Sequence, residues 1–395
     1  MSLNNTPSSE RVHIAFFGRR NSGKSSLINA VTGQELSIVS EVKGTTTDPV
    51  RKAMELLPLG PVVMIDTPGL DDEGSLGRQR MKQSYKVMAE TDAAVLVLDS
   101  KQGMTSEDEE ILEELKRRNL PYIIAWNKSD LTGEKKFLEN EISVSAKEGY
   151  NINKLKDMLS GILGTAGTGR RIIGDFIEAN DFIVLVAPID ESAPKGRLIL
   201  PQQQTIRDIL DSHANAIVVQ TSELSNTLSK LGGMLKLVVT DSQAFKEVDR
   251  IVPDYLPLTS FSILFARYKG DLRQTACGAQ KLDSLPDGAK VLISEGCTHH
   301  RQCNDIGAVK LPEMIKRYTG RRIEFEWTSG TGFKEDLTRY DLIVHCGGCM
   351  LNQAEMRYRL KCASEAGVPM TNYGIAIAKM NGILKRSLEI FGDDY

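Results

Sequence analysis

The sequence predicts an α/β protein whose sheets are mainly parallel and are divided among more than one domain. Three observations support this prediction. The chain has 395 residues, which exceeds the usual size of a single domain. Short apolar runs alternate with amphipathic stretches along most of it. Glycine-rich and polar motifs follow directly after several apolar runs, at the carboxyl ends of the expected strands, where open α/β sheets bind ligands.

Composition and charge indicate a globular chain without a preference for polyanions. Hydrophobic residues make up 41% of the chain, and 49 basic against 52 acidic residues leave a net charge of −3. This balance argues against nucleic acid or an anionic membrane as a partner. No apolar run approaches the roughly 18 residues of a membrane span, and the N-terminus lacks the pattern of a secretory signal. We therefore expect a cytoplasmic protein, in which the six cysteines favour metal binding over disulfides.

Composition shifts predict three domains, at residues 1–165, 170–268 and 269–395. The first boundary falls in Leu163–Gly169, a run of small residues typical of a flexible linker. The second domain has no cysteine and no phosphate loop, so we expect it to serve contact, such as self-association. Its apolar runs are expected to be buried strands of a small parallel sheet: Phe182–Ala187, Ala216–Val219, Leu235–Val239 and Phe261–Phe265.

A phosphate-binding loop follows the first apolar run. Val12–Phe17 is expected to be a buried strand, and residues 18–26 then read GRRNSGKSS before a helix. Glycines in such a loop let backbone N–H groups approach phosphate oxygens at the helix N-terminus. Lys24 is expected to reach the β- and γ-phosphates, and the Ser25 hydroxyl to ligate Mg²⁺. The predicted contacts of this loop are Asn21, Ser22, Gly23, Lys24, Ser25 and Ser26.

Three later motifs identify the nucleotide as GTP. The first reads DTPG, in which Asp66 is expected to hold the Mg²⁺ shell and the Gly69 N–H to sense the γ-phosphate. The second reads NKSD, in which the Asp130 carboxylate can accept two hydrogen bonds from guanine; adenine presents the wrong pattern. The third reads SAK and contacts the base oxygen. The other predicted base contacts are Asn127, Lys128, Ser145, Ala146 and Lys147.

Over residues 11–165 these motifs resemble the tRNA-modification and Era-like branch of the Ras-like P-loop GTPases. Residues 44–48, GTTTD, carry the resemblance in the switch I position. It implies that Thr46 is a second Mg²⁺ ligand and that Asn21 holds a K⁺ ion, which could stand in for an arginine finger. The expected fold is thus a Ras-like P-loop GTPase domain followed by two smaller α/β domains. The expected catalytic residues are Lys24, Thr46, Asp66 and Gly69.

Two residues depart from the pattern of that branch. Thr47 replaces the arginine of the switch I loop, and Leu70 stands where Ras-like enzymes place a catalytic glutamine. Leu70 therefore predicts slow GTP hydrolysis, and the role implied for Asn21 predicts that K⁺ stimulates it.

Two clusters of metal-ligating side chains mark the third domain. Cys297 and His299 follow one expected strand, and His345, Cys346 and Cys349 lie at the end of another. Because both clusters follow strand ends, they can meet over one edge of a sheet. A tetrahedral zinc site and an iron–sulfur cluster fit these residues about equally well. Chance clustering of free cysteines is the third interpretation. The thiolates number only three, so an iron–sulfur cluster needs a fourth ligand from elsewhere.

The CxH and HCxxC clusters, about 45 residues apart behind a GTPase domain and a cysteine-free region, resemble the HydF family of FeFe-hydrogenase maturation GTPases. This resemblance covers the whole chain. It implies that Cys297, Cys346 and Cys349 bind a 4Fe–4S cluster, with His299 and His345 as candidate fourth ligands. It also implies a homodimeric scaffold that receives a transient diiron precursor from the radical-SAM maturases HydE and HydG and delivers it to the apo-hydrogenase HydA.

The rival function is a GTPase that acts on tRNA or ribosomes and carries a structural zinc site. The net charge of −3 counts against it, as does the lack of a basic stretch interleaved with aromatic residues. The remaining cysteines, Cys277, Cys303 and Cys362, are expected to be ordinary thiols.

Overall fold

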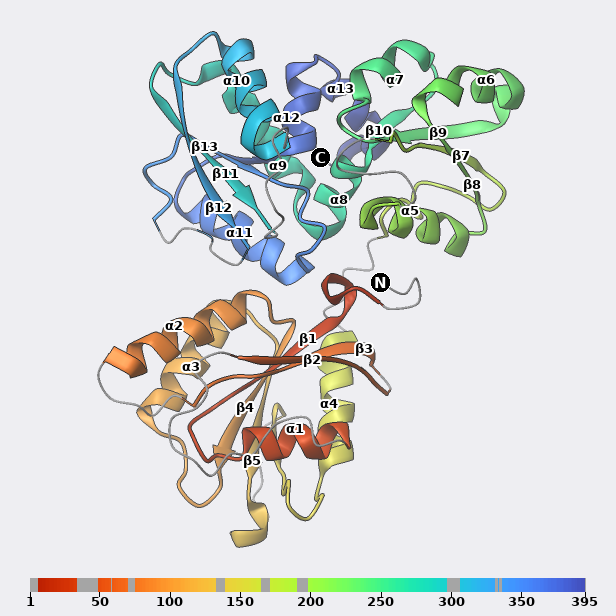
Figure 1. Cartoon of the computed structure of the whole chain (residues 1–395). Coiled ribbons are helices and arrows are strands. Elements are labelled where there is room, and N and C mark those ends of the chain that lie inside the picture. The colour runs from red at the N-terminus through yellow and green to blue at the C-terminus, as the bar shows by residue number, and fades with distance from the viewer. Residues whose placement is uncertain are drawn as a thin grey trace. The chain divides into compact units, whose positions relative to one another are not determined.

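The computed structural model describes residues 6–33, 49–57, 59–69, 75–132, 139–164, 171–189, 198–296, 306–330, 333 and 336–394. Contacts within the chain divide it into two compact units, residues 1–168 and 169–395 (Figure 1). Each unit is α/β, as the sequence predicts. The predicted boundary at residues 268 and 269 falls inside the second unit, so the division into three domains stays a prediction.

The first unit contains one six-stranded sheet with the order β2-β3-β1-β4-β5-β6, in which only the β2–β3 pair is antiparallel. Its strands are β1 (Val12–Phe17), β2 (Val50–Leu56), β3 (Gly60–Asp66), β4 (Ala93–Asp99), β5 (Tyr122–Asn127) and β6 (Glu141–Ser143). Its helices are α1 (Lys24–Thr32), α2 (Ser75–Ala89), α3 (Ser106–Arg117) and α4 (Ile152–Gly164).

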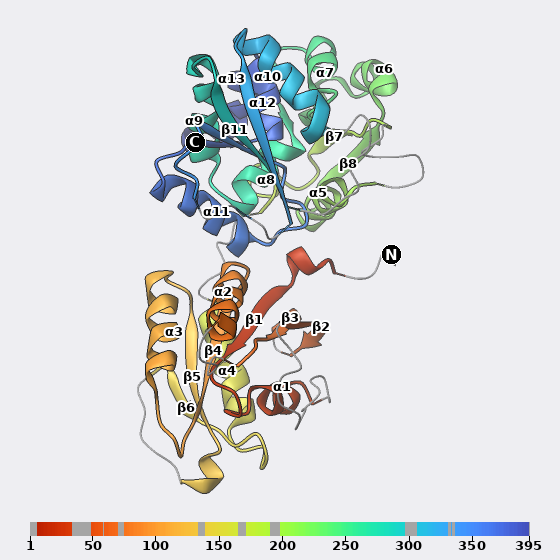
Figure 2. The same ribbon diagram turned by 60° about the vertical axis from the view of Figure 1, so that its left-hand side comes forward.

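Helices cover both faces of this sheet (Figure 2). Alternate residues of β1 enter two separate cores: Ile14 packs with Leu27 of α1 and Leu155 of α4, whereas Phe17 packs with Ile111 of α3. Burial on both faces explains why the strands appear in the sequence as continuous apolar runs. Because β1, β3, β4 and β5 run parallel, their carboxyl ends lie at one edge of the sheet.

The second unit contains two four-stranded, fully parallel sheets, with the orders β10-β9-β7-β8 and β12-β11-β13-β14. The first consists of β7 (Phe182–Val186), β8 (Asn215–Val219), β9 (Leu235–Thr240) and β10 (Leu258–Ser260). The second consists of β11 (Ala289–Glu295), β12 (Ile323–Ser329), β13 (Leu342–His345) and β14 (Met370–Asn372). The helices are α5 (Leu200–Asp211), α6 (Thr221–Leu231), α7 (Phe245–Ile251), α8 (Phe261–Lys269), α9 (Leu272–Ala279), α10 (Leu311–Thr319), α11 (Gln353–Glu365), α12 (Tyr373–Met380) and α13 (Leu384–Leu388).

The predicted strand at Phe261–Phe265 is wrong, because these residues form the first turns of helix α8. Ser260 caps the helix, since its hydroxyl accepts the Ile263 N–H at 3.4 Å. Helix α8 contacts α5, α9, α11 and α12, so it is buried nearly all round. A helix of this kind appears in the sequence as an apolar run without a polar face, which periodicity alone does not distinguish from a buried strand.

Residues near the C-terminus pack into the core of the first of these two sheets, whereas the strands of the second sheet line separate cores. Ile375, Leu388 and Phe391 pack with the side chains of β7, β9 and α8. The buried Thr259 hydroxyl donates to the Ser387 carbonyl at 2.9 Å. The residues that follow β14 therefore contact the sheet formed by β7–β10.

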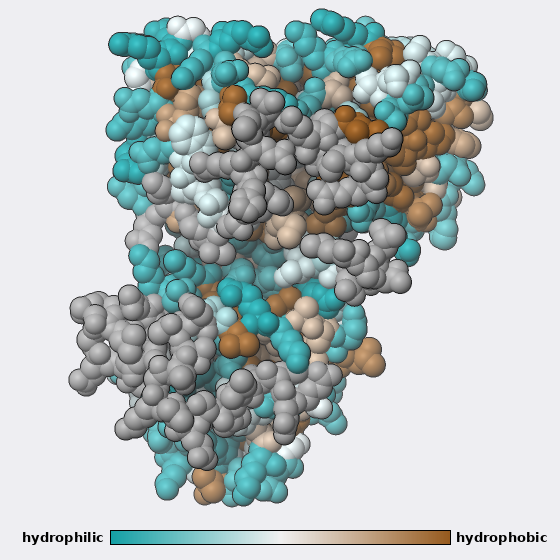
Figure 3. Space-filling view, in the orientation of Figure 1, coloured by the Kyte–Doolittle hydropathy of each residue, from teal (hydrophilic) through white to brown (hydrophobic). Residues whose placement is uncertain are grey.

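The surface of the second unit is apolar where Figure 1 places β7, β8 and β9, as the brown residues in Figure 3 show. Val218 of β8 is 43% exposed, and Met234, which precedes β9, is 56% exposed. Strand β8 lies at the edge of its sheet. Among the helices that the structure describes, none has both the length and the apolarity needed to cross a membrane.

Candidate functional site

The phosphate loop leaves the end of β1 and leads into α1. Gly18 has φ 137° and Gly23 has φ 92°, both in the region that favours glycine. A Cβ atom on Gly23 would lie 2.2 Å from Asn127 Nδ2. Lys24 is only 7% exposed, and its ammonium donates to the carbonyls of Gly18 and Arg19, both at 2.8 Å. The loop therefore curls around the lysine that the sequence assigns to the β- and γ-phosphates.

Two predicted Mg²⁺-binding residues meet beside this loop. The Ser25 hydroxyl donates to Asp66 Oδ2 at 2.6 Å. The other oxygen, Asp66 Oδ1, is buried and has no hydrogen-bond partner among the described residues. A buried carboxylate oxygen without a donor is costly unless a cation compensates it. The donor set at this point therefore fits Mg²⁺. Nearby, a Cβ atom on Gly69 would lie 2.7 Å from the Arg20 nitrogen, so the DTPG motif touches the phosphate loop.

The guanine motifs also contact the phosphate loop. Asn127 Nδ2 donates to the Ser22 carbonyl at 3.0 Å, while Asn127 Oδ1 accepts the Ala146 N–H at 3.1 Å. Lys128 donates to the Asn21 carbonyl at 2.6 Å. Thus Asn127 and Lys128 connect the NKSD and SAK motifs to the phosphate loop.

The carboxylate predicted to recognise guanine is held by a neighbouring motif. Asp130 Oδ1 accepts a hydrogen bond from the Ser145 hydroxyl at 2.7 Å. Lys147 lies on the surface, with its side chain 81% exposed. Asn21, at φ 59°, and Ser26 are also exposed. Thr46, Thr47 and Leu70 lie outside the described residues, so their expected roles stay predictions.

Asp99, which sequence reasoning missed, pairs with one of the predicted base-binding residues. It ends β4 and accepts a hydrogen bond from Lys128 at 2.7 Å. Burial acts to raise the pKa of Asp99, but hydrogen bonds from Lys128 and the Lys101 N–H outweigh burial and lower that pKa. Its place after an apolar strand, beside the other motif-bearing strand ends, is the signal that could have identified it.

In the second unit, the loop after β13 carries two of the predicted ligands, Cys346 and Cys349. Cys346 Sγ accepts the Gly296 N–H at 3.0 Å and the Gly348 N–H at 3.4 Å. Gly348 has φ 64°, and this conformation turns the chain between the two thiols. Gly296 follows β11, so the loops after β11 and β13 do meet at one sheet edge, as expected. Cys297 and His299 themselves lie outside the described residues.

A buried lysine from helix α8 holds this loop in place. Lys269 is 1% exposed, and its ammonium donates to the carbonyls of Leu351 at 2.8 Å, Cys349 at 3.2 Å and Gly348 at 3.5 Å. Burial raises the pKa of the Cys349 thiol, and the charge of Lys269 opposes that change. No sequence motif points to Lys269.

A second buried cation, Arg359 of α11, holds the strand end that precedes the loop. Its guanidinium is fully buried and pairs with Glu355 at 2.8 Å. It also donates to the Gly330 carbonyl at 2.7 Å and to His345 Nε2 at 3.0 Å. Arg359 therefore connects α11 with β13 and with the residue that follows β12.

His345 is engaged at both ring nitrogens. Its Nδ1 lies 2.7 Å from the Cys346 carbonyl, which requires Nδ1 to carry the proton, and Nε2 accepts from Arg359. Burial, followed by the charge of Arg359, lowers the pKa of His345 to about 3, so its ring is neutral. To ligate a metal through Nε2, His345 would have to lose its hydrogen bond from Arg359.

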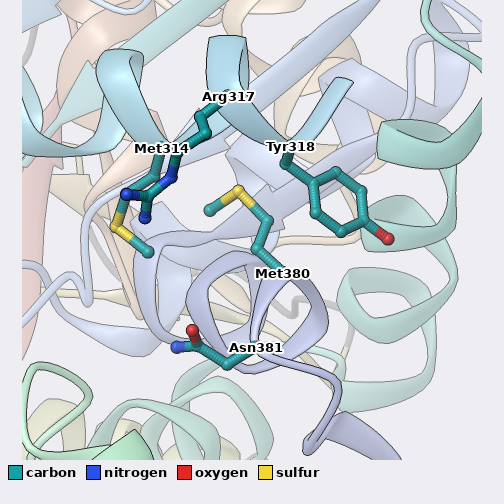
Figure 4. Close-up of a pocket in the computed structure, with 5 residues that line it drawn as sticks. All are labelled: Met314, Arg317, Tyr318, Met380 and Asn381. Atoms are coloured by element: carbon teal, nitrogen blue, oxygen red, sulfur yellow. The ribbon is translucent and has the colours of Figure 1, made fainter. Parts of the chain in front are cut away.

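The described residues contain no group of three or more His, Cys, Asp or Glu side chains placed to hold a metal. This finding does not include residues 297–305. Cys277 is exposed on α9, and Cys362 is half-buried in α11. A shallow hollow elsewhere is lined by Met314, Arg317 and Tyr318 of α10 together with Met380 and Asn381 (Figure 4), and none of these was a predicted site residue.

Over part of its length the chain is similar to GTPases of known families. It is 33% identical over 172 residues to the tRNA modification GTPase MnmE of Nitrosomonas eutropha, an alignment that covers 42% of this chain and 37% of that protein. It is also 33% identical over 171 residues to GTPase Der of Kosmotoga olearia, covering 38% of each. The alignments thus span little more than a third of these relatives' length.

Some solved structures of GTPases match part of the chain with low TM-scores. Era in complex with MgGDPNP and a segment of 16S ribosomal RNA matches with 19% identity and a TM-score of 0.36, covering 57% of this chain and 98% of Era. A probable GTP-binding protein engB matches with 24% identity and a TM-score of 0.33, covering 39% of this chain and all of that one.

Three family models match separate parts of the chain. A 50S ribosome-binding GTPase model matches residues 13–128, which include the phosphate loop and the NKSD motif up to its lysine. The hydrogen maturase F dimerization domain matches residues 172–270, and the hydrogen maturase F tetramerization domain matches residues 273–390. These two models together cover more than half of the chain, behind a GTPase domain. The chain therefore belongs to the hydrogen maturase F (HydF) family of GTPases.

Proposed function

We propose that this chain is a GTP-hydrolysing scaffold for the maturation of FeFe-hydrogenase. It would receive a diiron precursor from HydE and HydG on a domain that bears a 4Fe–4S cluster, and deliver it to the apo-hydrogenase HydA. The observation that carries the proposal is the order of the matched domains: a GTPase domain followed by two hydrogen maturase F domains. The second of these contains the loop with Cys346 and Cys349.

In the GTPase domain, the proposed roles follow from the contacts around the phosphate loop. Lys24 would turn from the loop carbonyls to the β- and γ-phosphates, and Ser25 and Asp66 would hold Mg²⁺. Thr46 would complete the Mg²⁺ shell and Gly69 would sense the γ-phosphate. The support is the Ser25–Asp66 hydrogen bond of 2.6 Å together with the buried Asp66 Oδ1, which has no partner in the described part of the chain.

The cluster would be held by Cys346, Cys349 and Cys297, with His299 or His345 as the fourth ligand. The two described thiols support this assignment by their surroundings. Cys346 Sγ already accepts two backbone N–H groups, and such donors stabilise the thiolates that ligate iron–sulfur clusters. When bound, the cluster would supply an iron-rich docking point for the diiron cargo. The role of this chain's residues is to keep both sulfur atoms at one sheet edge.

Self-association is part of the proposal. The names of the two matched domains refer to dimerization and tetramerization. Strand β8, at a sheet edge, together with the apolar surface around β7 and β9, supports a homodimer formed through the first of these domains. The rival function on tRNA or ribosomes is not favoured, because the models that match beyond residue 172 belong to hydrogen maturase F.

The decisive test is iron and labile sulfide in anaerobically purified protein. The wild type should carry both and activate apo-hydrogenase in the presence of HydE and HydG. Cys346→Ala and Cys349→Ala should each lose the iron, whereas Cys362→Ala, which removes another half-buried thiol, should retain it. One zinc ion per chain without iron would overturn the cluster, and a cluster-bearing protein that fails to activate HydA would overturn the scaffold.

The potassium site is tested separately. GTP hydrolysis should be slow in Na⁺ and faster in K⁺, and Asn21→Ala should remove the difference. Asn119→Ala serves as the matched control, because Asn119 is also an exposed asparagine at positive φ (54°) and lies between α3 and β5, outside the nucleotide-binding motifs. Equal rates in both salts would contradict the assignment of Asn21.

A further inference from the structure

A buried side chain that bonds to the cysteine loop (residues 346–351) comes from outside the domain that carries the cysteines. Lys269 ends α8, within the residues matched by the dimerization domain, whereas the loop belongs to the tetramerization domain. The Lys269 ammonium is buried beside the Phe265 ring, 5.7 Å from its centroid. It contacts the carbonyls of three of the four residues that begin at Gly348.

A charge buried in this way has two consequences. Removing an ammonium from water is costly, and the three carbonyl acceptors offset that cost only while the loop keeps its shape. The loop is therefore fixed by α8 as well as by its own strand. The positive charge also remains close to the cysteines, in surroundings that screen it much less than water does.

We propose that Lys269 is a positioning residue for the cysteine loop and that its charge stabilises the reduced, electron-rich state of a metal group bound by Cys346 and Cys349. The inference rests on the proposed function in taking that group to be an iron–sulfur cluster. Potentials of such clusters depend on net charge and on hydrogen bonds near the sulfur atoms. A fixed cation lowers the energy of an added electron, so its removal disfavours reduction.

The test is the midpoint potential of the cluster, followed by electron paramagnetic resonance during an anaerobic redox titration of the full chain. Lys269→Gln keeps an N–H donor but removes the charge. We expect it to shift the balance between the reduced and oxidised cluster at least tenfold toward the oxidised form, which for a one-electron couple is about 59 mV. Lys269→Arg keeps the charge and should remain close to wild type.

The matched control is Arg267→Gln on the same helix. Arg267 is 6% exposed, and its guanidinium bonds to Asp175 and to the Arg171 carbonyl, not to the cysteine loop. This variant loses a buried cation from α8 and should leave the midpoint potential unchanged. A second readout is the rate at which a chelator removes iron, which should rise at least several-fold in Lys269→Gln and stay at the wild-type value in Lys269→Arg.

Two outcomes would overturn the inference: a wild-type midpoint and iron-loss rate in Lys269→Gln, or equal shifts in the Gln and Arg variants. If Lys269→Gln does not fold, Lys269→Met replaces it, since an unbranched apolar side chain suits the buried position, and the same expectations apply. Wild-type protein without iron and sulfide would contradict the proposed function itself. If the wild type carries the cluster but its midpoint potential does not depend on the charge at position 269, only this inference is contradicted.

Discussion

The nucleotide site and the cysteine loop are held in place by different kinds of residues. In the nucleotide site, the partners of motif residues are mostly other motif residues: Lys128 contacts Asn21, and Asn127 contacts Ser22. In the cysteine loop, the supporting side chains are Lys269 and Arg359, which belong to no motif. A site that is built from its own motifs can be recognised in the sequence. A site that is supported by single residues of neighbouring helices cannot.

The largest effect is expected at the nucleotide site. Lys24→Ala should reduce GTP hydrolysis by at least about 100-fold, the cost of removing one essential donor to developing charge. Phosphate release at saturating GTP measures it. The iron content of the variant should equal that of the wild type, since Lys24 belongs to the first unit and the cysteines belong to the second. Loss of iron in Lys24→Ala would break the comparison, because it would make the two sites interdependent.

The next effect concerns the support of the cysteine loop. Arg359→Met removes the guanidinium that pairs with the buried Glu355 carboxylate, so the free energy of unfolding of the second unit should fall by about 3–5 kcal/mol. Urea unfolding in a Trp126→Phe background, followed by fluorescence of Trp327 alone, reports on this unit.

Arg322→Met is the control for that measurement, because Arg322 pairs with Asp287 at the surface, where its side chain is 89% exposed. It should not move the urea midpoint measurably. The double variant Arg359→Met with Glu355→Leu removes the buried carboxylate as well. If it regains stability, the loss in Arg359→Met comes from that carboxylate. Equal midpoints for Arg359→Met and the wild type would contradict a supporting role for this pair.

A smaller effect separates the two glycines between Cys346 and Cys349. Gly348 has φ 64°, so Gly348→Ala should destabilise the metal-free protein by about 1–2 kcal/mol. At Gly347 an added Cβ meets no atom of the described chain within 4 Å, and Gly347→Ala should change stability by less than about 0.5 kcal/mol. The same tryptophan readout compares the two variants. If Gly347→Ala proved the costlier, the loop would have a different conformation from the one described.

The smallest effect is expected at the ion pair between Lys128 and Asp99. The Lys128 side chain is 33% exposed, so Lys128→Met should cost about 1 kcal/mol or less. The lowered pKa of Asp99 means that the pair stabilises the fold above the usual aspartate pKa of about 4, and that this contribution is lost as pH falls through the folded-state pKa. Urea midpoints in a Trp327→Phe background should differ between variant and wild type at pH 7, and converge toward pH 3. A difference that persists at low pH would assign the effect to packing.

The errors of prediction have physical causes that particular residues illustrate. Strand β1 agrees with its prediction because two buried faces produce a continuous apolar run, which the phosphate-loop motif bounds. Helix α8 produces the same kind of run for a different reason, its burial among four other helices. The spacing of apolar residues shows which faces of an element are buried. It cannot distinguish a helix from a strand when every face is buried.

The sequence by itself determined the GTPase motifs, the parallel α/β class and the pair of cysteines after β13, because each depends on short runs of residues whose spacing reflects local geometry. Only the tertiary structure decided that Ser25 reaches Asp66, that both His345 nitrogens are engaged and that Lys269 enters the cysteine loop. These contacts join residues from 14 to 80 positions apart, except for one bond within the loop itself. They arise from how helices and sheets pack, and a single buried lysine or arginine leaves no periodic trace in the chain.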